Sequence, residues 1–226
     1  MVHICCTEIV QRQMFYIFFP VRRIYTNFKM VYKMIYKDDF INERKLSDGT
    51  EAQKKLRDTL KKMLKHRPIR EISVQELCKK ACVGRTTFYS YYQNLDELLE
   101  EIEDIFVYDM FKLNNEMLFP EYKSPADFIF FSKSYEYIKD NKDLILGLIV
   151  NYPSDRFLEK WKNCIKYHFA RKFGRQNMCE KDDYIYEMIA IMIIHSHIYY
   201  LKNNNSEVPQ NDIVEMMSAV FTMFSM

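Results

Sequence analysis

The chain has 226 residues, 48% of them hydrophobic, and a formal net charge of +2. This length suits one large domain or a small domain joined to a medium one, with enough apolar residues for a core. Only four glycines and six prolines occur, which excludes a turn-rich β fold and favours an all-α fold. No Rossmann or P-loop glycine pattern occurs, so the usual phosphate-binding loops are excluded.

Residues 1–46 form the first distinct segment. The apolar stretch MFYIFFPV within it is far shorter than the roughly 20 residues that a membrane span requires. The stretch also lacks the basic n-region and the small-residue cleavage site of a signal peptide. We therefore expect a poorly ordered N-terminal extension over residues 1–46, in which the residues before about Met30 either belong to the extension or derive from an upstream start. An interfacial anchor is the alternative.

The charge of the chain changes sign at one boundary. Residues 51–95 carry an excess of seven positive charges, whereas residues 96–104 contain six acidic residues and no lysine or arginine. This pattern is typical of a module that faces a polyanion, followed by a solvated acidic helix. Two ordinary charged helix faces are the alternative.

Helix signals begin at Thr50, which is expected to cap a helix that ends before Pro68. Ser73 then starts a second helix, and Glu76, three residues later, completes a capping box. The Val83-Gly84 pair breaks this second helix. The apolar positions of the first helix share one face: Leu56, Leu60, Met63 and Leu64.

A short third helix is expected from about Arg85 to Tyr91, and a fourth begins near Asp96. Two short helices joined by a turn form a helix-turn-helix, whose second helix lies in the major groove of DNA. Phe88 and Tyr92, four residues apart, are expected to face the core. The outward positions would meet phosphates and base edges, and they are Arg85, Thr86, Thr87, Tyr89 and Tyr91.

The stretch ISVQELCKKACVGRTTFYSYYQNLDELL, residues 72–99, resembles the DNA-binding domain of the TetR family of transcriptional regulators. The matching features are a hydroxyl at the start of the second helix, Thr-Phe-Tyr on the third, an aromatic pair and an acidic Leu-Leu start to the fourth. The resemblance implies an all-helical homodimer with DNA-binding domains at 47–106 and effector-binding and dimerisation domains at 107–226. It implies DNA contacts from Ser73 and from the outward positions of the third helix.

Two positions depart from the family pattern. Cys82 stands where the family usually has Gly, and Leu95 stands where a Lys commonly holds a phosphate. We therefore expect that phosphate anchor to be missing. Lys54 and Lys55 on the first helix are further candidates for phosphate contact.

The rest of the chain continues in helices. They are expected over residues 124–139, 141–150, 154–172, 184–201 and 212–224. The helix over 184–201 is apolar on nearly all sides, so one face needs a partner. We expect the last two helices to form the homodimer interface, with Ile189 and Ile193 as members; a buried core helix in a monomer is the alternative.

Aromatic residues are the candidates for an effector pocket, although core packing is the more common role of such residues. No catalytic triad, carboxylate pair or zinc-like cysteine spacing occurs, so we expect no enzyme activity, cofactor or metal, and the six unpatterned cysteines fit a reducing cytoplasm. The candidate pocket residues are Tyr108, Phe111, Phe128, Phe131, Tyr135 and Trp161.

The resemblance implies a ligand-responsive repressor that binds a palindromic operator as a homodimer and is released by a small-molecule effector. A helical ligand-binding or enzyme-like domain that carries an incidental helix-turn-helix is the alternative. The charge reversal and the Thr-Phe-Tyr helix favour the regulator.

Overall fold

The computed structural model describes residues 49–117, 129–173 and 180–203. The chain divides into two compact units, Met1–Asn42 and Glu43–Met226, and all described residues belong to the second. The expected N-terminal extension, residues 1–46, and the expected helix over 212–224 lie outside the described residues. Throughout the described ranges the regular elements are helices, which confirms the all-α prediction.

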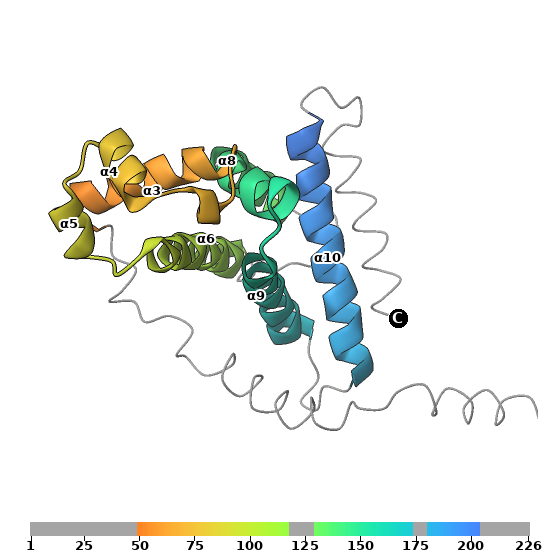
Figure 1. Ribbon diagram of the computed structural model, residues 1–226. Coiled ribbons are helices and arrows are strands. Elements are labelled where there is room, and N and C mark those ends of the chain that lie inside the picture. The colour runs from red at the N-terminus through yellow and green to blue at the C-terminus, as the bar shows by residue number, and fades with distance from the viewer. Residues whose placement is uncertain (1–48, 118–128, 174–179, 204–226) are drawn as a thin grey trace, which may run out of the picture. The chain divides into compact units, whose positions relative to one another are not determined.

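The first helices form a small group within the second unit, in which α3 (Glu51–Leu64) packs on α4 (Val74–Ala81), as Figure 1 shows. A full capping box starts α3. The Thr50 hydroxyl accepts from the backbone N–H of Gln53, and the side-chain oxygen of Gln53 accepts from the backbone N–H of Thr50. A single 3-10 turn, η2 (Ile69–Glu71), joins the two helices. The inner residues of this group are fully buried and include Leu56, Leu60 and Leu77.

The capping box expected at α4 is only half formed. The Ser73 hydroxyl accepts from the Glu76 amide at 3.1 Å, as expected of an N-cap. The Glu76 carboxylate instead pairs with Arg67 at 2.6 Å and Lys80 at 3.1 Å. Hydrogen bonds from both cations lower the pKa of Glu76, so this side chain fixes the start of α4 by ion pairing.

The expected break at Val83-Gly84 lies between α4 and α5 (Arg85–Tyr89), and Cys82 also belongs to this turn. Cys82 takes the left-handed conformation with φ 54°, while Gly84 is extended and serves as N-cap of α5. Cys82 is the non-glycine residue with positive φ among the described residues. This geometry explains why glycine is the usual residue here in the family that the sequence resembles, because glycine adopts this region without steric cost.

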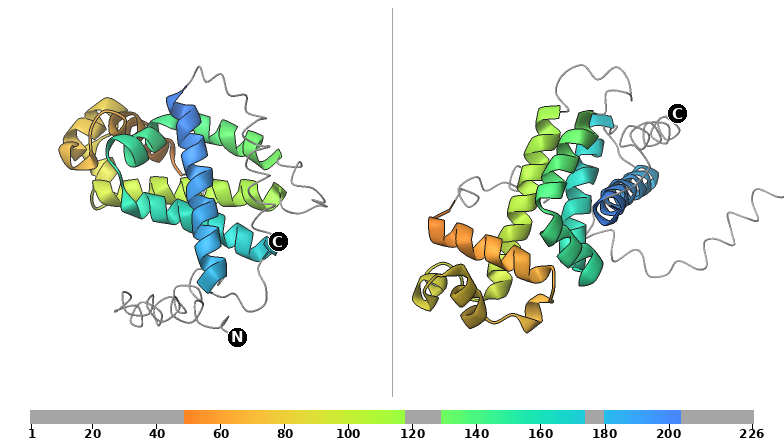
Figure 2. Two further views of the ribbon diagram at one scale, coloured as in Figure 1. Left: turned by 90° about the vertical axis from the view of Figure 1, so that its right-hand side faces the viewer. Right: turned by 90° about the horizontal axis from the view of Figure 1, so that it is seen from above.

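The longer helices form the rest of the unit (Figure 2). Helix α6 spans Leu95–Met117, and the domain boundary expected at residue 106 falls inside it. The helices that follow are α7 (Ile129–Asp140), α8 (Lys142–Ile145), the π-helix η4 (Leu146–Asn151), α9 (Asp155–Phe173) and α10 (Glu180–Lys202).

Helix α9 is the centre of this bundle, since it packs on both α6 and α10. Trp161 of α9 is fully buried, with its ring 5.1 Å from Phe106 of α6 and 6.4 Å from His197 of α10. An ion pair with one buried partner adds to the α6–α9 contact: Glu103 is 0% exposed and accepts two hydrogen bonds from the more exposed Arg156, at 2.8 and 3.1 Å. Ring contacts and ion pairs together hold the bundle in one register.

Candidate nucleic-acid interface

The inner side of α5 is held by Phe88, which is fully buried as the sequence predicts. Its ring lies 5.5 Å from that of Tyr92, which is 3% exposed. The Tyr92 hydroxyl accepts from Gln53 of α3 at 3.4 Å, and burial raises its pKa to about 12. These contacts fix the rotation of α5 about its own axis and therefore decide which residues face outward.

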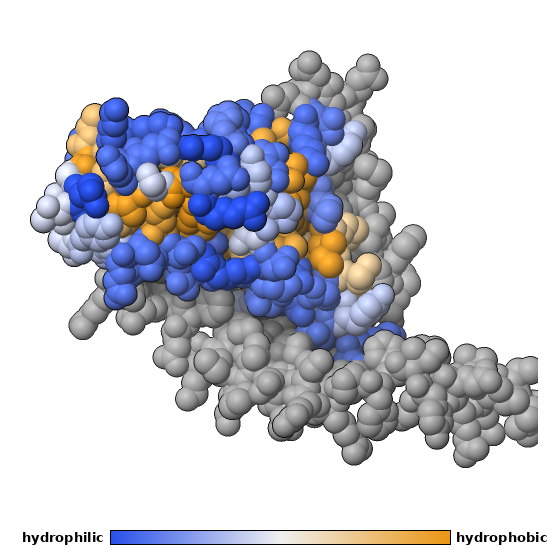
Figure 3. Space-filling model, viewed as in Figure 1, coloured by the Kyte–Doolittle hydropathy of each residue, from blue (hydrophilic) through white to orange (hydrophobic). Residues whose placement is uncertain are grey.

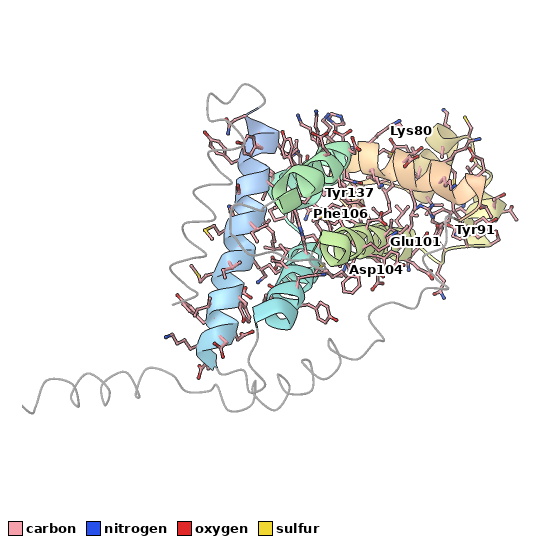
Figure 4. The ribbon with its side chains drawn as sticks, turned by 180° about the vertical axis from the view of Figure 1, so that it is seen from behind. Lys80, Tyr91, Glu101, Asp104, Phe106 and Tyr137 are labelled. Atoms are coloured by element: carbon pink, nitrogen blue, oxygen red, sulfur yellow. The ribbon has the colours of Figure 1, made fainter. Side chains whose placement is uncertain are left out.

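The outer side of α5 carries hydroxyl, aromatic and guanidinium groups. Arg85 and Thr86 are exposed, Tyr89 is 52% exposed, and Tyr91 just beyond the helix is 37% exposed. In Figure 4, Tyr91 lies at the end of the molecule formed by α4 and α5, well away from Tyr137 of α7. Thr87 is half-buried, and its outward orientation stays a prediction. The other four of the five expected residues are exposed, and we call them the α5 outer face: Arg85, Thr86, Tyr89 and Tyr91.

The excess of basic residues in this region is partly neutralised within the chain. Arg57 is buried and pairs with Glu101 of α6 at 2.6 Å, so it links two helices. Lys65 pairs with Asp143 of α8 at 2.9 Å. Other basic side chains remain exposed, and Figure 3 shows hydrophilic residues over much of this end of the molecule, with apolar ones in a band between them. The exposed lysines and arginines include Lys54, Lys62, Arg70 and Lys79.

The candidate phosphate contacts on α3 are both exposed. Lys54 makes no ion pair within the described part of the chain, and Lys55 lies 3.7 Å from Glu51 in an exposed pair of little strength. Ser73 is exposed, although its hydroxyl already serves as the N-cap of α4. Contact with DNA stays a prediction for all three.

The start of α6 is closed by side chains. The Asn94 side chain accepts from the Glu97 amide at 2.9 Å, and the Glu97 carboxylate accepts from the Gln93 amide at 2.7 Å. Leu95, the first residue of α6, supplies no charge for a phosphate. These two bonds, from Glu97 to Asn94 and from Gln93 to Glu97, were not expected from the sequence, although Asn94 followed three residues later by Glu97 is the signal that would have found them.

The four candidate effector residues whose side chains are described each contact different neighbours. Trp161 is a core residue, and Phe111 packs against Tyr167 and His168 at 5.5 and 5.1 Å. Tyr135 meets Tyr200 at 5.3 Å, while the Tyr108 ring lies under the ammonium of Lys112 at 4.5 Å. Phe128 and the side chain of Phe131 lie outside the described residues. An effector role stays a prediction for these aromatics.

Ile189 and Ile193 of α10 are 3% and 1% exposed in the single chain. Both were expected at a dimer interface, but they face the core of their own bundle because the buried residues of α10 follow a helical stripe. The opposite side of α10 carries exposed apolar residues, which we call the α10 outer face. Its members are Tyr184 at 66% exposure, Met188 at 45% and Tyr199 at 47%.

Among the described residues, no group of histidine, cysteine, aspartate and glutamate side chains is arranged to hold a metal ion. None of the described helices is both long and apolar enough to cross a membrane.

Solved structures share this arrangement of helices. A transcriptional regulator (TerR/AcrR family) from Aquifex aeolicus VF5 aligns with 76% of this chain and 99% of its own, with a TM-score of 0.55 and 16% sequence identity. A tetR-family transcriptional regulator from Streptomyces coelicolor aligns with 78% of this chain and 83% of its own, with a TM-score of 0.56 and 11% identity. The chain has the TetR fold.

A third structure with this fold, from Pseudomonas aeruginosa PAO1, aligns with 80% of this chain and 94% of its own, with a TM-score of 0.59 and 15% identity. By sequence, no family model and no curated protein matches the chain. The likeness to the TetR fold therefore lies in the arrangement of the helices, and the fold class expected from the sequence is confirmed.

Proposed function

We propose that this protein is a DNA-binding transcriptional regulator whose α5 enters the major groove. The observation that carries the proposal is the division of α5 into a buried side, fixed by Phe88, and the α5 outer face. Thr86 and Tyr89 on that face present hydroxyl groups, and Arg85 presents a guanidinium, all of which bind phosphates or base edges. The TetR fold supports this assignment by analogy, because solved regulators share it.

The regulator is proposed to act as a homodimer through α10. Large apolar side chains that are 45–66% exposed on one helix side mark a surface that a partner covers. A second copy of the chain is the proposed partner, since a two-fold dimer presents two α5 helices to a palindromic operator. The expected members of this interface are now Tyr184, Met188 and Tyr199. Ile189 and Ile193 are no longer among them, since both are buried in the single chain.

Repression and release by a small-molecule effector complete the proposal. Binding at a promoter would exclude polymerase, and an effector bound among α6, α7, α9 and α10 would change the relative position of the two α5 helices. The coupling is reciprocal, so effector and operator each weaken the binding of the other. A regulator of this kind acts in the cytoplasm and needs neither a catalytic group nor a cofactor.

The test is selection of DNA duplexes from a random pool, followed by a shift assay at several salt concentrations. The protein should enrich a palindromic site and bind it with an affinity that falls as salt rises. Replacing Lys54 and Lys55 by Ala should flatten the log–log salt dependence by about 0.9 for each phosphate that is no longer neutralised. Failure to enrich any duplex would favour the alternative, a helical ligand-binding domain with an incidental helix-turn-helix.

A further inference from the structure

The end of α3 meets the bundle in a contact too close for any side chain at one position. Gly147 of η4 is buried, and a Cβ placed there would lie 2.7 Å from the carbonyl oxygen of Leu64 and 2.9 Å from its carbonyl carbon. Both of these atoms belong to the backbone and cannot rotate away. Glycine is therefore required at residue 147 for η4 to approach the last turn of α3 this closely.

Side chains from the same segment bind the carbonyl groups just beyond α3. The Asn151 amide donates to the carbonyl oxygen of Lys65 at 2.9 Å, and the Tyr152 hydroxyl donates to that of His66 at 2.7 Å. Carbonyl groups at the C-terminal end of a helix have no partner within the helix. The bundle thus supplies caps for the end of α3, from residues 86 positions further along the chain.

The π-helical geometry of η4 places these groups together. The Tyr152 amide donates to the Gly147 carbonyl at 2.9 Å, five residues back, as in a π turn. Helix α9, which contacts η4, begins three residues after Tyr152. A shift of α9 would therefore reach the end of α3 through this one turn.

Two lysines also contact this junction. Lys65 and Asp143 form an ion pair in which both side chains are more than one-third exposed, and such a pair contributes little to a fixed geometry. The Lys61 ammonium donates to the Asn141 side chain at 3.4 Å. The close approach of Gly147 and the bonds from Asn151 and Tyr152 differ from these contacts because each is made to the backbone of residues 64–66.

We propose that Gly147, Asn151 and Tyr152 are positioning residues that fix the orientation of α3, and with it α5, so that the dimer accepts one spacing between operator half-sites. The inference rests on the proposed function. It assigns to these three residues a role in DNA specificity although none of them lies on the α5 outer face. Loosening the caps broadens the accepted spacing, whereas a methyl group at residue 147 displaces α3 and changes the preferred spacing.

The test uses the full chain and the palindrome that the wild-type protein selects, with versions carrying one or two base pairs inserted at its centre. Each inserted base pair moves and rotates one half-site relative to the other, because one turn takes about 10 base pairs. The combined Asn151→Ala and Tyr152→Phe variant should reduce the binding penalty of a one-base-pair insertion by about tenfold, as expected when two hydrogen bonds are removed. Amide hydrogen exchange over residues 65–72 should also become faster.

Tyr137→Phe is the matched control. It removes a tyrosine hydroxyl bond of 2.9 Å to Asp109, which joins α7 to α6 and leaves Gly147, Asn151 and Tyr152 in place. The control should keep the wild-type spacing penalty. Equal penalties in the wild type and the double variant, or an equal reduction in the control, would overturn the proposal.

Gly147→Ala provides a second reading. We expect weaker binding to the selected palindrome and a relative gain, of about tenfold or more, on a palindrome of different spacing, with helical content retained. A Gly147→Ala protein that folds and keeps the wild-type ranking of spacings contradicts the inference. If the wild-type protein selects no DNA, the proposed function itself fails. That result differs from failure of the inference, in which the wild-type protein binds DNA and the variants keep its preference for spacing.

Discussion

Two helices of this molecule expose large aromatic side chains, and their surroundings differ. On α5, the exposed Tyr89 is preceded by Arg85 and Thr86 in a helix of five residues. On α10, Tyr184 and Tyr199 flank the exposed Met188 in a helix of 23 residues. The first face combines rings with donors and a positive charge, and the second combines rings with the apolar Met188 and, at the same helical spacing, the exposed His195.

An exposed tyrosine does not by itself identify a partner. Its neighbours decide the class, since donors and cations suit a phosphate backbone whereas apolar neighbours suit a protein surface. The inner sides of both helices are alike, with Phe88 and Ile193 fully buried or nearly so. Substitutions on the inner sides should therefore act on folding, and those on the outer faces on two different kinds of binding.

The largest effect is expected from Phe88→Ala on the inner side of α5. Removing a fully buried ring should lower the free energy of unfolding by about 3–5 kcal/mol, measured by urea denaturation. Tyr89→Ala, at the next position, should change it by less than about 1 kcal/mol. Similar losses from both substitutions would remove the distinction between the two sides of α5.

A smaller effect, on association, is expected from Met188→Asp and Tyr199→Asp on the α10 outer face. A charge buried at the interface should weaken dimerisation by about 2–3 kcal/mol. Ile189→Asp should instead unfold the bundle. Sedimentation and circular dichroism would separate the cases, and a stable dimer in both outer-face variants would place the interface on another surface.

DNA affinity should respond next to the α5 outer face. Thr86→Ala and Tyr89→Ala should each weaken binding to the selected operator by about tenfold, or 1.4 kcal/mol, with the dimer intact. Met188→Ser serves as a control from the other exposed face, measured above the dimer dissociation constant. Wild-type affinity in both α5 variants would contradict the placement of this helix in the groove.

The two histidines of α10 provide a pH test of its two sides. Burial lowers the pKa of His197 from 6.5 to about 3, whereas His195 is exposed. Below the unfolded-state value the unfolded chain binds more protons, so the stability that neutral His197 contributes is present above that value and is lost as the pH falls. Between about pH 7.5 and pH 6.0 the loss should be about 0.8 kcal/mol.

His197→Phe should remove this dependence, and His195→Phe should leave it unchanged. Urea midpoints at the two pH values measure both. An unchanged pH dependence in His197→Phe would show that the inner side of α10 is not the source.

The smallest effect is expected at the turn that leads into α5. Cys82→Gly relieves the left-handed strain at φ 54°, and after the entropy of the unfolded chain is subtracted the gain should be about 0.5 kcal/mol. Gly84→Ala is the control for a glycine change in the same turn without left-handed strain, since its added Cβ would meet only Thr87 at an ordinary 3.5 Å. A loss of stability in Cys82→Gly would mean that the turn relaxes in some other way.

The sequence predicted the helix-turn-helix well because its signals are local. Each signal involves residues only a few positions apart: Thr50 and Ser73 each cap the helix that begins at the next residue, and Phe88 and Tyr92 are four residues apart. Each lies where the pattern placed it. The left-handed conformation of Cys82 was not predicted, because cysteine carries no local signal for it.

The larger bundle was predicted less completely because its decisive contacts are long-range. The apolar pattern of α10 indicates a helix with two apolar sides, but only packing on α9 decides that Ile189 faces inward and Met188 outward. Likewise, nothing near Arg57 in the sequence indicates that Glu101 will neutralise it. Periodicity gives the face of a helix without naming the neighbour that covers it.

The position of Trp161 has an optical consequence. It is the single tryptophan of the chain, it is fully buried in the bundle, and its ring stacks on His197 at an interplanar angle of 13°. Ultraviolet emission excited at the indole band therefore arises from one site on α9, in an apolar setting that favours short wavelengths. The protein carries its own fluorophore between α6 and α10, so rearrangement of these helices can be followed in stopped-flow experiments without a label.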